Sequence, residues 1–156
     1  MAEIDRSLIG SVMPAFEVEV ERGAIRKFAR AIGDENPLFH DVAHARTHGH
    51  ADIVAPPTFP TTFRPVADAP WMAPLDRRRI MAGTVAFTYE RPVVAGMRLA
   101  CILGLTGVDE KRGSKGLMEL MRQDMRVEDD AGGLVLVFSR TTVYRSLDQV
   151  EKASLA

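Results

Sequence analysis

The sequence predicts an α+β protein in which an antiparallel sheet of about five strands packs on one apolar helix. Two observations predict this architecture. From residue 84 to residue 140, apolar and polar side chains alternate with a period of two, and short turn-forming stretches separate the alternating segments. The first half is instead rich in proline and has apolar residues at helical spacing. Strands joined by short turns form an antiparallel meander, and its apolar face needs a cover.

The first elements are a strand and a helix. Residues 16–20 alternate apolar and acidic side chains, which is typical of a half-buried strand. Residues 25–32 have apolar side chains at helical spacing, and Gly33 follows where a left-handed cap ends a helix. An ordered loop is expected from Asp34 to Asp41 because it contains Asn-Pro.

Two further helices are expected before the sheet. A short one runs over residues 41–47. The second starts at Pro57 and continues to Arg64, because proline at the first helical position loses no hydrogen bond. Since this stretch is apolar, we expect it to be the helix that covers the sheet. Residues 67–79 contain Pro70 and Pro74 and predict a surface excursion.

Four alternating segments follow. They lie at residues 84–89, 97–105, 117–125 and 134–140, with turns expected at 92–96, 109–116 and 129–133. Leu117, Glu119, Met121, Gln123 and Met125 should share one face, and Arg140 continues the apolar alternation of its own segment.

Composition narrows the class of protein. A chain of 156 residues, 46% apolar and 26% charged, fits a single domain over residues 1–156. The net charge of −1 gives no reason to expect nucleic acid or an anionic membrane as partner. Cys101 is the single cysteine, which fits a reducing compartment. With no apolar run long enough for a signal peptide or a membrane helix, we expect a cytoplasmic protein.

Three segments carry a resemblance to a known family. Residues 28–41, which read FARAIGDENPLFHD, resemble the hydratase segment of MaoC-like dehydratases, whose core is Gly-Asp-x-Asn-Pro-Leu-His-x-Asp. Residues 53–59 and 89–97 are similar to the N-terminal, dehydratase-like branch, although Met97 replaces an acid usual there. The resemblance extends from about residue 16 to 145. It implies a hotdog fold, in which a long antiparallel sheet wraps around a central helix.

The family implies a catalytic arrangement that this sequence keeps only in part. In active members an aspartate and a histidine of the loop hold a water, and a backbone N–H at the start of the central helix, usually from glycine, serves the thioester carbonyl. Asp34 occupies the aspartate position. Asp41 keeps the register, so Phe39 stands at the histidine position and His40 is displaced by one. Pro57 stands at the glycine and has no N–H.

These departures resemble the substrate-holding subunits of heterodimeric hydroxyacyl-thioester dehydratases, whose partner supplies the acid–base pair. The resemblance therefore implies a protein that binds an acyl-CoA or acyl-carrier-protein thioester, as a homodimer or as a heterodimer with a catalytic MaoC-like subunit. It makes Asp34 and His40 the candidate catalytic residues. The candidate substrate-binding residues are Asn36, Phe39, Pro57, Thr58 and Phe59. No cofactor is expected.

Other functions stay open. The chain could be a self-sufficient (R)-specific enoyl-CoA hydratase that uses Asp34 and His40. It could also be a non-enzymatic acyl-CoA binding or sensing protein, or a hotdog thioesterase, although the apolar segment after Pro57 lacks the acid or glutamine that thioesterases usually place there.

Simpler interpretations accompany several residues. Asp34 and Asn36 could serve only the loop, and Phe39 could be a core residue. His40, His44 and His48 are spaced by four, but Thr47 and Gly49 disfavour a continuous helix, and no metal is expected. Packing is the simpler role for Cys101 and for the methionines at 118, 121 and 125, which could otherwise line an acyl tunnel. Residues 77–79, three arginines, could contact phosphates or simply be solvated.

Overall fold

The computed structural model describes residues 2–113 and 116–146, and five strands dominate it. The strands and α-helices are β1 (Phe16–Glu19), α1 (Arg22–Ala31), α2 (Val42–Thr47), β2 (Ile80–Tyr89), β3 (Arg98–Gly113), β4 (Gly116–Asp129) and β5 (Leu134–Ser146). Short 3-10 helices lie at Arg6–Leu8 (η1), Pro37–Phe39 (η2), Phe59–Thr62 (η3) and Arg77–Arg79 (η4). No helix among these residues is long and apolar enough to cross a membrane.

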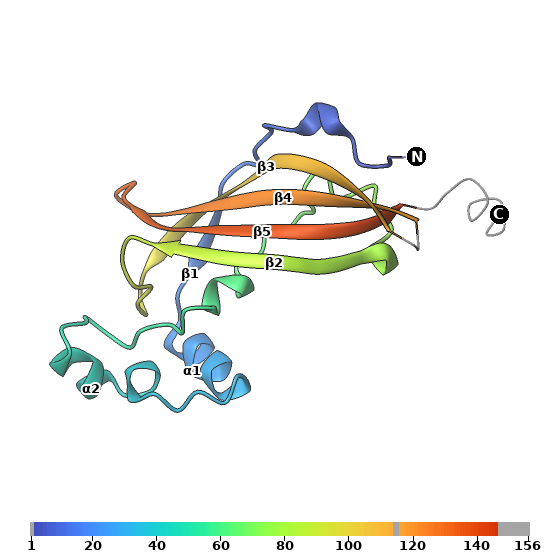
Figure 1. Cartoon of the computed structure of the whole chain (residues 1–156). Helices are drawn as coiled ribbons and strands as arrows, with labels where there is room; N and C mark the ends of the chain where they lie inside the picture. The colour runs from blue at the N-terminus through green and yellow to red at the C-terminus, as the bar shows by residue number, and fades with distance from the viewer. Residues whose placement is uncertain (1, 114–115, 147–156) are drawn as a thin grey trace.

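The five strands form one antiparallel sheet in the order β1-β3-β4-β5-β2 (Figure 1). The meander β3-β4-β5 is its centre, as the alternating second half of the sequence predicts, and the predicted α+β hotdog class is confirmed. The turn expected at residues 109–116 is wrong over its first part, because Asp109 pairs with Leu120 and β3 continues to Gly113. Charged residues are accommodated there because this end of β3 is exposed to water.

The two faces of the sheet differ as the alternation predicts. In β4 the residues Leu117, Glu119, Met121, Gln123 and Met125 are all buried on the inner face. Arg122 lies between Met121 and Gln123 on the outer face, Arg126 follows Met125 on the same face, and both are exposed. A side chain in a strand points opposite to its neighbours, so burial on one side produces this pattern directly.

The long helix predicted from Pro57 to Arg64 is wrong. Only residues 59–62 are helical, as the 3-10 turn η3. Pro60 interrupts the segment because it has no N–H and disfavours a helical conformation in the residue before it. The hydroxyls of Thr61 and Thr62 donate to the carbonyls of Thr58 and Phe59, at 2.8 Å each, and take acceptors that an α-helix would use.

An irregular segment therefore covers the inner face where the helix was expected. It continues from η3 to η4 and passes behind the sheet in the view of Figure 1. Phe63, Trp71 and Leu75 are its buried anchors, and Trp71 is only 1% exposed.

The buried carboxylate of Glu119 accepts from the backbone N–H of Glu3 at 2.8 Å and from the hydroxyl of Ser146 at 2.5 Å. The N-terminal segment is thus also fastened to the sheet.

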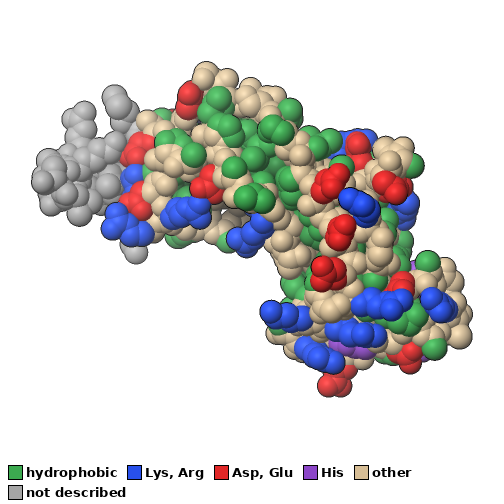
Figure 2. All heavy atoms as spheres, turned by 180° about the vertical axis from the view of Figure 1, so that it is seen from behind, with side chains coloured by type: hydrophobic (Ala, Val, Ile, Leu, Met, Phe, Trp, Pro, Cys, Tyr) green, Lys and Arg blue, Asp and Glu red, His purple; other side chains and the backbone are tan. Residues whose placement is uncertain are grey.

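The two α-helices form a smaller lobe at one end of the sheet (Figures 1 and 2). Gly33 ends α1 with φ of +71°, a conformation that glycine adopts without steric cost, as predicted. The short helix expected at 41–47 is also confirmed, with Asp41 as its cap. Arg22 of α1 pairs with Asp52 at 2.5 Å, and hydrogen bonds from the guanidinium are the main cause that lowers the pKa of the Asp52 carboxyl to about 2.

Candidate functional site

The loop between α1 and α2 is held by its own polar side chains. The carboxylate of Asp34 accepts from the backbone N–H of Asn36 at 3.0 Å. The amide oxygen of Asn36 accepts in turn from the N–H of Leu38 at 3.0 Å and caps η2. These are the local turns that aspartate and asparagine favour, because a short acceptor reaches a backbone N–H two residues on. Both side chains therefore shape the loop, whatever else they do.

His40 and Phe39 leave this loop in different directions. The Nε2 atom of His40 lies 2.9 Å from the backbone carbonyl oxygen of Asp34, rather than on its carboxylate. The guanidinium of Arg26 donates to the carbonyl of His40 at 2.9 Å and fixes the loop against α1. Phe39 is instead buried, with 6% of its surface exposed. Because the histidine is at position 40 rather than 39, its side chain points away from the buried side chain of Phe39.

The two residues consequently belong to two different depressions. Asp34 and His40 line an open hollow of about 320 Å³ together with Arg30, Gly33 and Glu35, and we refer to it as the Asp34 hollow. Phe39 lines a separate depression of about 440 Å³, which we refer to as the apolar pocket. The apolar pocket is lined by Asn36, Leu38, Phe39, Val54, Ala55, Pro57, Tyr89, Glu90, Arg91, Pro92 and Val93.

Backbone hydrogen bonds build the wall of the apolar pocket. The N–H of Val54 donates to Leu38 O at 2.9 Å, and the N–H of Ala55 donates to Val93 O at 2.8 Å. The segment before Pro57 is thereby fixed between the loop and the end of β2. Because these two N–H groups are used and Pro57 has none, these three residues offer no free backbone donor to a carbonyl oxygen in the pocket.

Tyr89 closes the pocket on the β2 side. Its hydroxyl donates to the carbonyl oxygen of Pro57 at 2.7 Å. Burial raises the pKa of the Tyr89 phenol to about 12, so the group stays neutral and keeps its proton for that bond. Arg91 at the rim is ion-paired with Asp129. The pocket therefore has an apolar wall, one neutral phenol, a rim arginine whose charge is compensated, and the exposed carboxylate of Glu90.

The seven candidate residues from the sequence fall into three groups. Asn36, Phe39 and Pro57 lie together in the apolar pocket, whereas Asp34 and His40 lie in the Asp34 hollow. Thr58 and Phe59 lie in neither lining. Thr58 is exposed beside η3, and Phe59 is a core residue that is 4% exposed.

Residues missed at the sequence level complete the pocket. Leu38 could have been recognised as a lining residue, because it lies between the candidate residues Asn36 and Phe39 in the sequence. The stretch 89–93 was marked only by its resemblance to a family strand. Nothing in the local sequence brings it against residues 54–57, because that contact arises from the bridge between Val54 and Val94.

The remaining candidates have structural roles. Cys101 is fully buried, and burial raises the pKa of its thiol to about 12, so it is a poor nucleophile. The rings of His44 and His48 are 4.2 Å apart, with α2 ending at Thr47 between them. Within residues 2–113 and 116–146, no group of three or more His, Cys, Asp or Glu side chains is placed to hold a metal. Met121 and Met125 are buried in the sheet.

Comparison with known proteins identifies relatives over most of the chain. The family described as "FAS1-like, dehydratase domain region" matches residues 7–138. A UPF0336 protein of Streptomyces coelicolor is 36% identical over 154 residues, which cover 94% of this chain and 98% of that protein.

Two solved structures have the same fold. The complex described as C-terminally truncated HadBC (3R-hydroxyacyl-ACP dehydratase) from Mycobacterium tuberculosis contains a chain with a TM-score of 0.75 and 25% identity, covering 87% of this chain and 96% of that one. A protein described as a MaoC-like dehydratase also has a TM-score of 0.75, with 27% identity, covering 91% of this chain and 43% of that one.

Proposed function

The chain belongs to the FAS1-like dehydratase family, whose solved relatives include MaoC-like dehydratases, and on that premise we propose that it binds an acyl thioester in the apolar pocket. In this proposal it is the substrate-holding half of a dehydratase, and a catalytic MaoC-like subunit supplies the acid–base pair. The thioester would be carried by CoA or by an acyl carrier protein.

The lining of the apolar pocket supports a ligand with an aliphatic part. Leu38, Val54 and Val93 face a space of about 440 Å³, which is in the range of ordinary small-molecule sites. Removing an acyl chain from water contributes about 25 cal/mol per Å² of apolar surface. The rim arginine is paired with Asp129, and Glu90, the one carboxylate of the lining, is exposed to water, so an aliphatic chain can lie on the apolar residues without burying that charge.

The observation that carries the substrate-holding role is the position of Phe39. Hydration of an enoyl thioester adds the oxygen of water to the β-carbon and a proton to the α-carbon, and this requires a base beside the substrate. The side chain in the pocket at this point is an apolar ring, and His40 lines the Asp34 hollow instead. Pro57 offers no N–H to the developing enolate oxygen. A chain of this kind can hold the substrate but needs another source of acid–base groups.

One observation favours a second candidate, a self-sufficient enoyl-CoA hydratase. Asp34 and His40 line the same hollow, and the His40 ring is within hydrogen-bond distance of the Asp34 backbone. A substrate bound there would meet both groups at once. This candidate requires the thioester to lie in the Asp34 hollow, away from the apolar pocket.

The direct test is binding without turnover. We expect crotonyl-CoA to bind the purified chain saturably by isothermal calorimetry while the enoyl absorbance stays almost constant. Leu38→Asp should weaken binding by about tenfold or more, because a charge at the wall of an apolar pocket must be desolvated when the acyl chain enters. Ile32→Asp, at a half-exposed position outside the pocket, is the matched control and should bind as the parent does.

Three outcomes would contradict the proposal. Equal binding by Leu38→Asp and the parent would show that the acyl group is not in the apolar pocket. Robust hydration by the unmodified chain, lost in both Asp34→Asn and His40→Ala, would establish the self-sufficient hydratase instead. Hydration that survives His40→Ala would exclude both the substrate-holding role and the self-sufficient hydratase.

The assembly is expected to be at least dimeric. β2 pairs with β5 on one side and lies at the end of the described sheet on the other, with Met81 and Val85 about half exposed. An exposed edge of this length favours pairing with a second sheet. Sedimentation at micromolar concentration should show a dimer, and Val85→Lys should shift it toward monomer. Val66→Lys, at a fully exposed position outside the sheet, should not. A stable monomer of the parent chain would contradict this expectation.

A further inference from the structure

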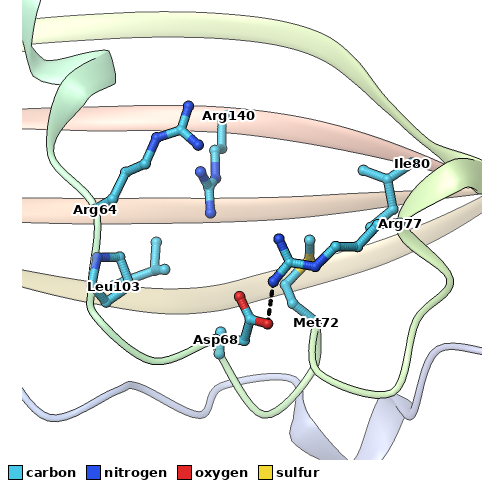
Figure 3. A pocket seen from close by; sticks show the side chains of 9 residues that line it. Arg64, Asp68, Met72, Arg77, Ile80, Leu103 and Arg140 are labelled. Carbon is cyan, nitrogen blue, oxygen red and sulfur yellow. Dashed lines mark hydrogen bonds and ion pairs between the residues drawn. The ribbon is translucent and has the colours of Figure 1, made fainter.

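A third depression, on the inner face of the sheet, gathers three arginines. It has a volume of about 290 Å³, and we refer to it as the arginine cavity. Figure 3 shows the guanidinium groups of Arg64, Arg77 and Arg140 turned toward one another from three separate segments. The cavity is lined by Arg64, Pro65, Asp68, Ala69, Met72, Arg77, Ile80, Leu103 and Arg140. None of these residues lines the apolar pocket or the Asp34 hollow.

The positive charge in this cavity is only partly compensated. Arg77 is ion-paired with Asp68, the single carboxylate of the lining. Arg64 forms no hydrogen bond or ion pair with any residue that the structure describes. Arg140 donates to the side-chain oxygen of Gln123 at 3.0 Å, which is a neutral acceptor. Two of the three guanidinium groups thus lack an anion.

Arg140 occupies an unfavourable position for a charged group. Its backbone register pairs it with Gln123 of β4 and Val85 of β2, so its side chain points to the inner face with the buried residues. Its Nε atom is buried and has no hydrogen-bond partner among the described residues. Burial, and then the nearby charge of Arg64, lower the pKa of Arg140. A buried donor without an acceptor costs stability, and a bound anion would remove that cost.

We propose that the arginine cavity is a binding site for an aliphatic carboxylate. The carboxylate oxygens would lie between Arg64 and Arg140, and the alkyl chain would lie against Leu103, Met72 and Ile80. Planar guanidinium groups match a carboxylate with two parallel hydrogen bonds. The apolar remainder of the lining suits a hydrocarbon chain. Asp68 on the same wall disfavours a doubly charged phosphate, so a singly charged ligand fits better.

A hydrogen-bonded chain links the cavity to a natural probe. Trp71 is the single tryptophan of the protein. Its indole N–H donates to the side-chain oxygen of Gln123 at 3.0 Å, and this is the same oxygen that accepts from Arg140. An anion that draws Arg140 away from Gln123 will therefore alter the environment of the indole N–H. The indole signal in a ¹H–¹⁵N NMR spectrum reports binding without any assay of activity.

The experiment titrates the full chain with octanoate and follows that indole signal. We expect a saturable shift with octanoate and none with octan-1-ol, which has the same chain length without the charge. Arg64→Gln and Arg140→Gln should each weaken octanoate binding by about tenfold or more, as the loss of a charge-assisted hydrogen bond predicts. Arg78→Gln is the matched control, because Arg78 is an exposed arginine of the same region outside the cavity.

Each other outcome overturns the proposal. An equal shift with octan-1-ol would mean that the cavity binds only apolar chains. Inorganic phosphate binding as tightly as octanoate would mean a general anion site. Unchanged octanoate affinity in Arg64→Gln would place the ligand elsewhere, and Arg64 remains a safe position for substitution because it is exposed. A change of oligomeric state in Arg64→Gln, without octanoate binding by the parent, would mean that a carboxylate of a second chain fills the cavity.

Discussion

Replacing Phe39 by histidine and Pro57 by glycine in the same chain should create hydration of crotonyl-CoA that the parent chain nearly lacks. Phe39 and Pro57 line the same pocket, so the new imidazole and the new backbone N–H would face one ligand. A missing oxyanion donor costs about 10²–10³ in rate. A missing general base costs roughly 10²–10⁴ more. The double variant should therefore exceed the parent by several orders of magnitude when enoyl absorbance is followed.

The controls separate chemistry from folding. Each single variant should gain less than the double variant, because either the base or the donor is still absent. Since Phe39 is 6% exposed, a thermal melt must first show that the variant is folded. A folded double variant with no gain would mean that position 39 does not face the reacting carbons.

The sheet could be predicted well because each strand has one buried and one exposed face. Burial forces a period of two, and residues 117–125 show that period in the sequence and in the structure. Strand ends were less predictable. Asp109 and its neighbours look like a turn by composition, yet backbone pairing with β4 keeps them in β3. Hydrogen bonds to a partner strand are not visible in the composition of a single segment.

The helix expected after Pro57 failed for a definable reason. Proline at a helix start is compatible with an α-helix, but Pro60 inside the same segment is not, and threonine hydroxyls compete for the backbone acceptors. The apolar side chains were correctly expected to be buried, since Phe59 and Phe63 are both in the core. Apolar composition identified Phe59 and Phe63 as covering residues, but it could not distinguish a helix from a folded irregular segment. The surface excursion expected at residues 67–79 is wrong for Trp71 and Leu75, which are buried.

The sequence also predicted some features of the candidate sites and missed others. Phe39 and His40 are neighbours in the chain, and neighbouring side chains in an extended loop point in different directions, so their separation could be predicted. The alternation of β5 likewise places Arg140 among the inward-facing residues. The meeting of Arg64 with Arg140, and of residues 54–57 with Tyr89, depends on how distant segments fold over one another. No local pattern encodes such contacts, so they required the structure.

Phe59 should be among the most important residues for stability, and Phe59→Ala should lower the free energy of unfolding by about 3–5 kcal/mol. Its ring is 4% exposed and packs edge-to-face on Phe28 of α1, with ring centroids 5.5 Å apart, and on Phe63, at 5.7 Å. It therefore joins the helical lobe to the segment that covers the sheet. For a chain of this size the melting temperature should fall by roughly 10 °C.

Thr58→Ala is the matched control, because Thr58 is the exposed neighbour and its side chain forms no hydrogen bond with a described residue. It should change the unfolding free energy by less than about 0.5 kcal/mol. Phe59→Leu should fall between the two, since leucine restores much of the buried volume but not the aromatic edge contacts. Urea unfolding followed by the fluorescence of Trp71 measures all three. If Phe59→Ala and Thr58→Ala were equally stable, the edge-to-face contact between Phe28 of α1 and Phe59 of η3 would be energetically unimportant.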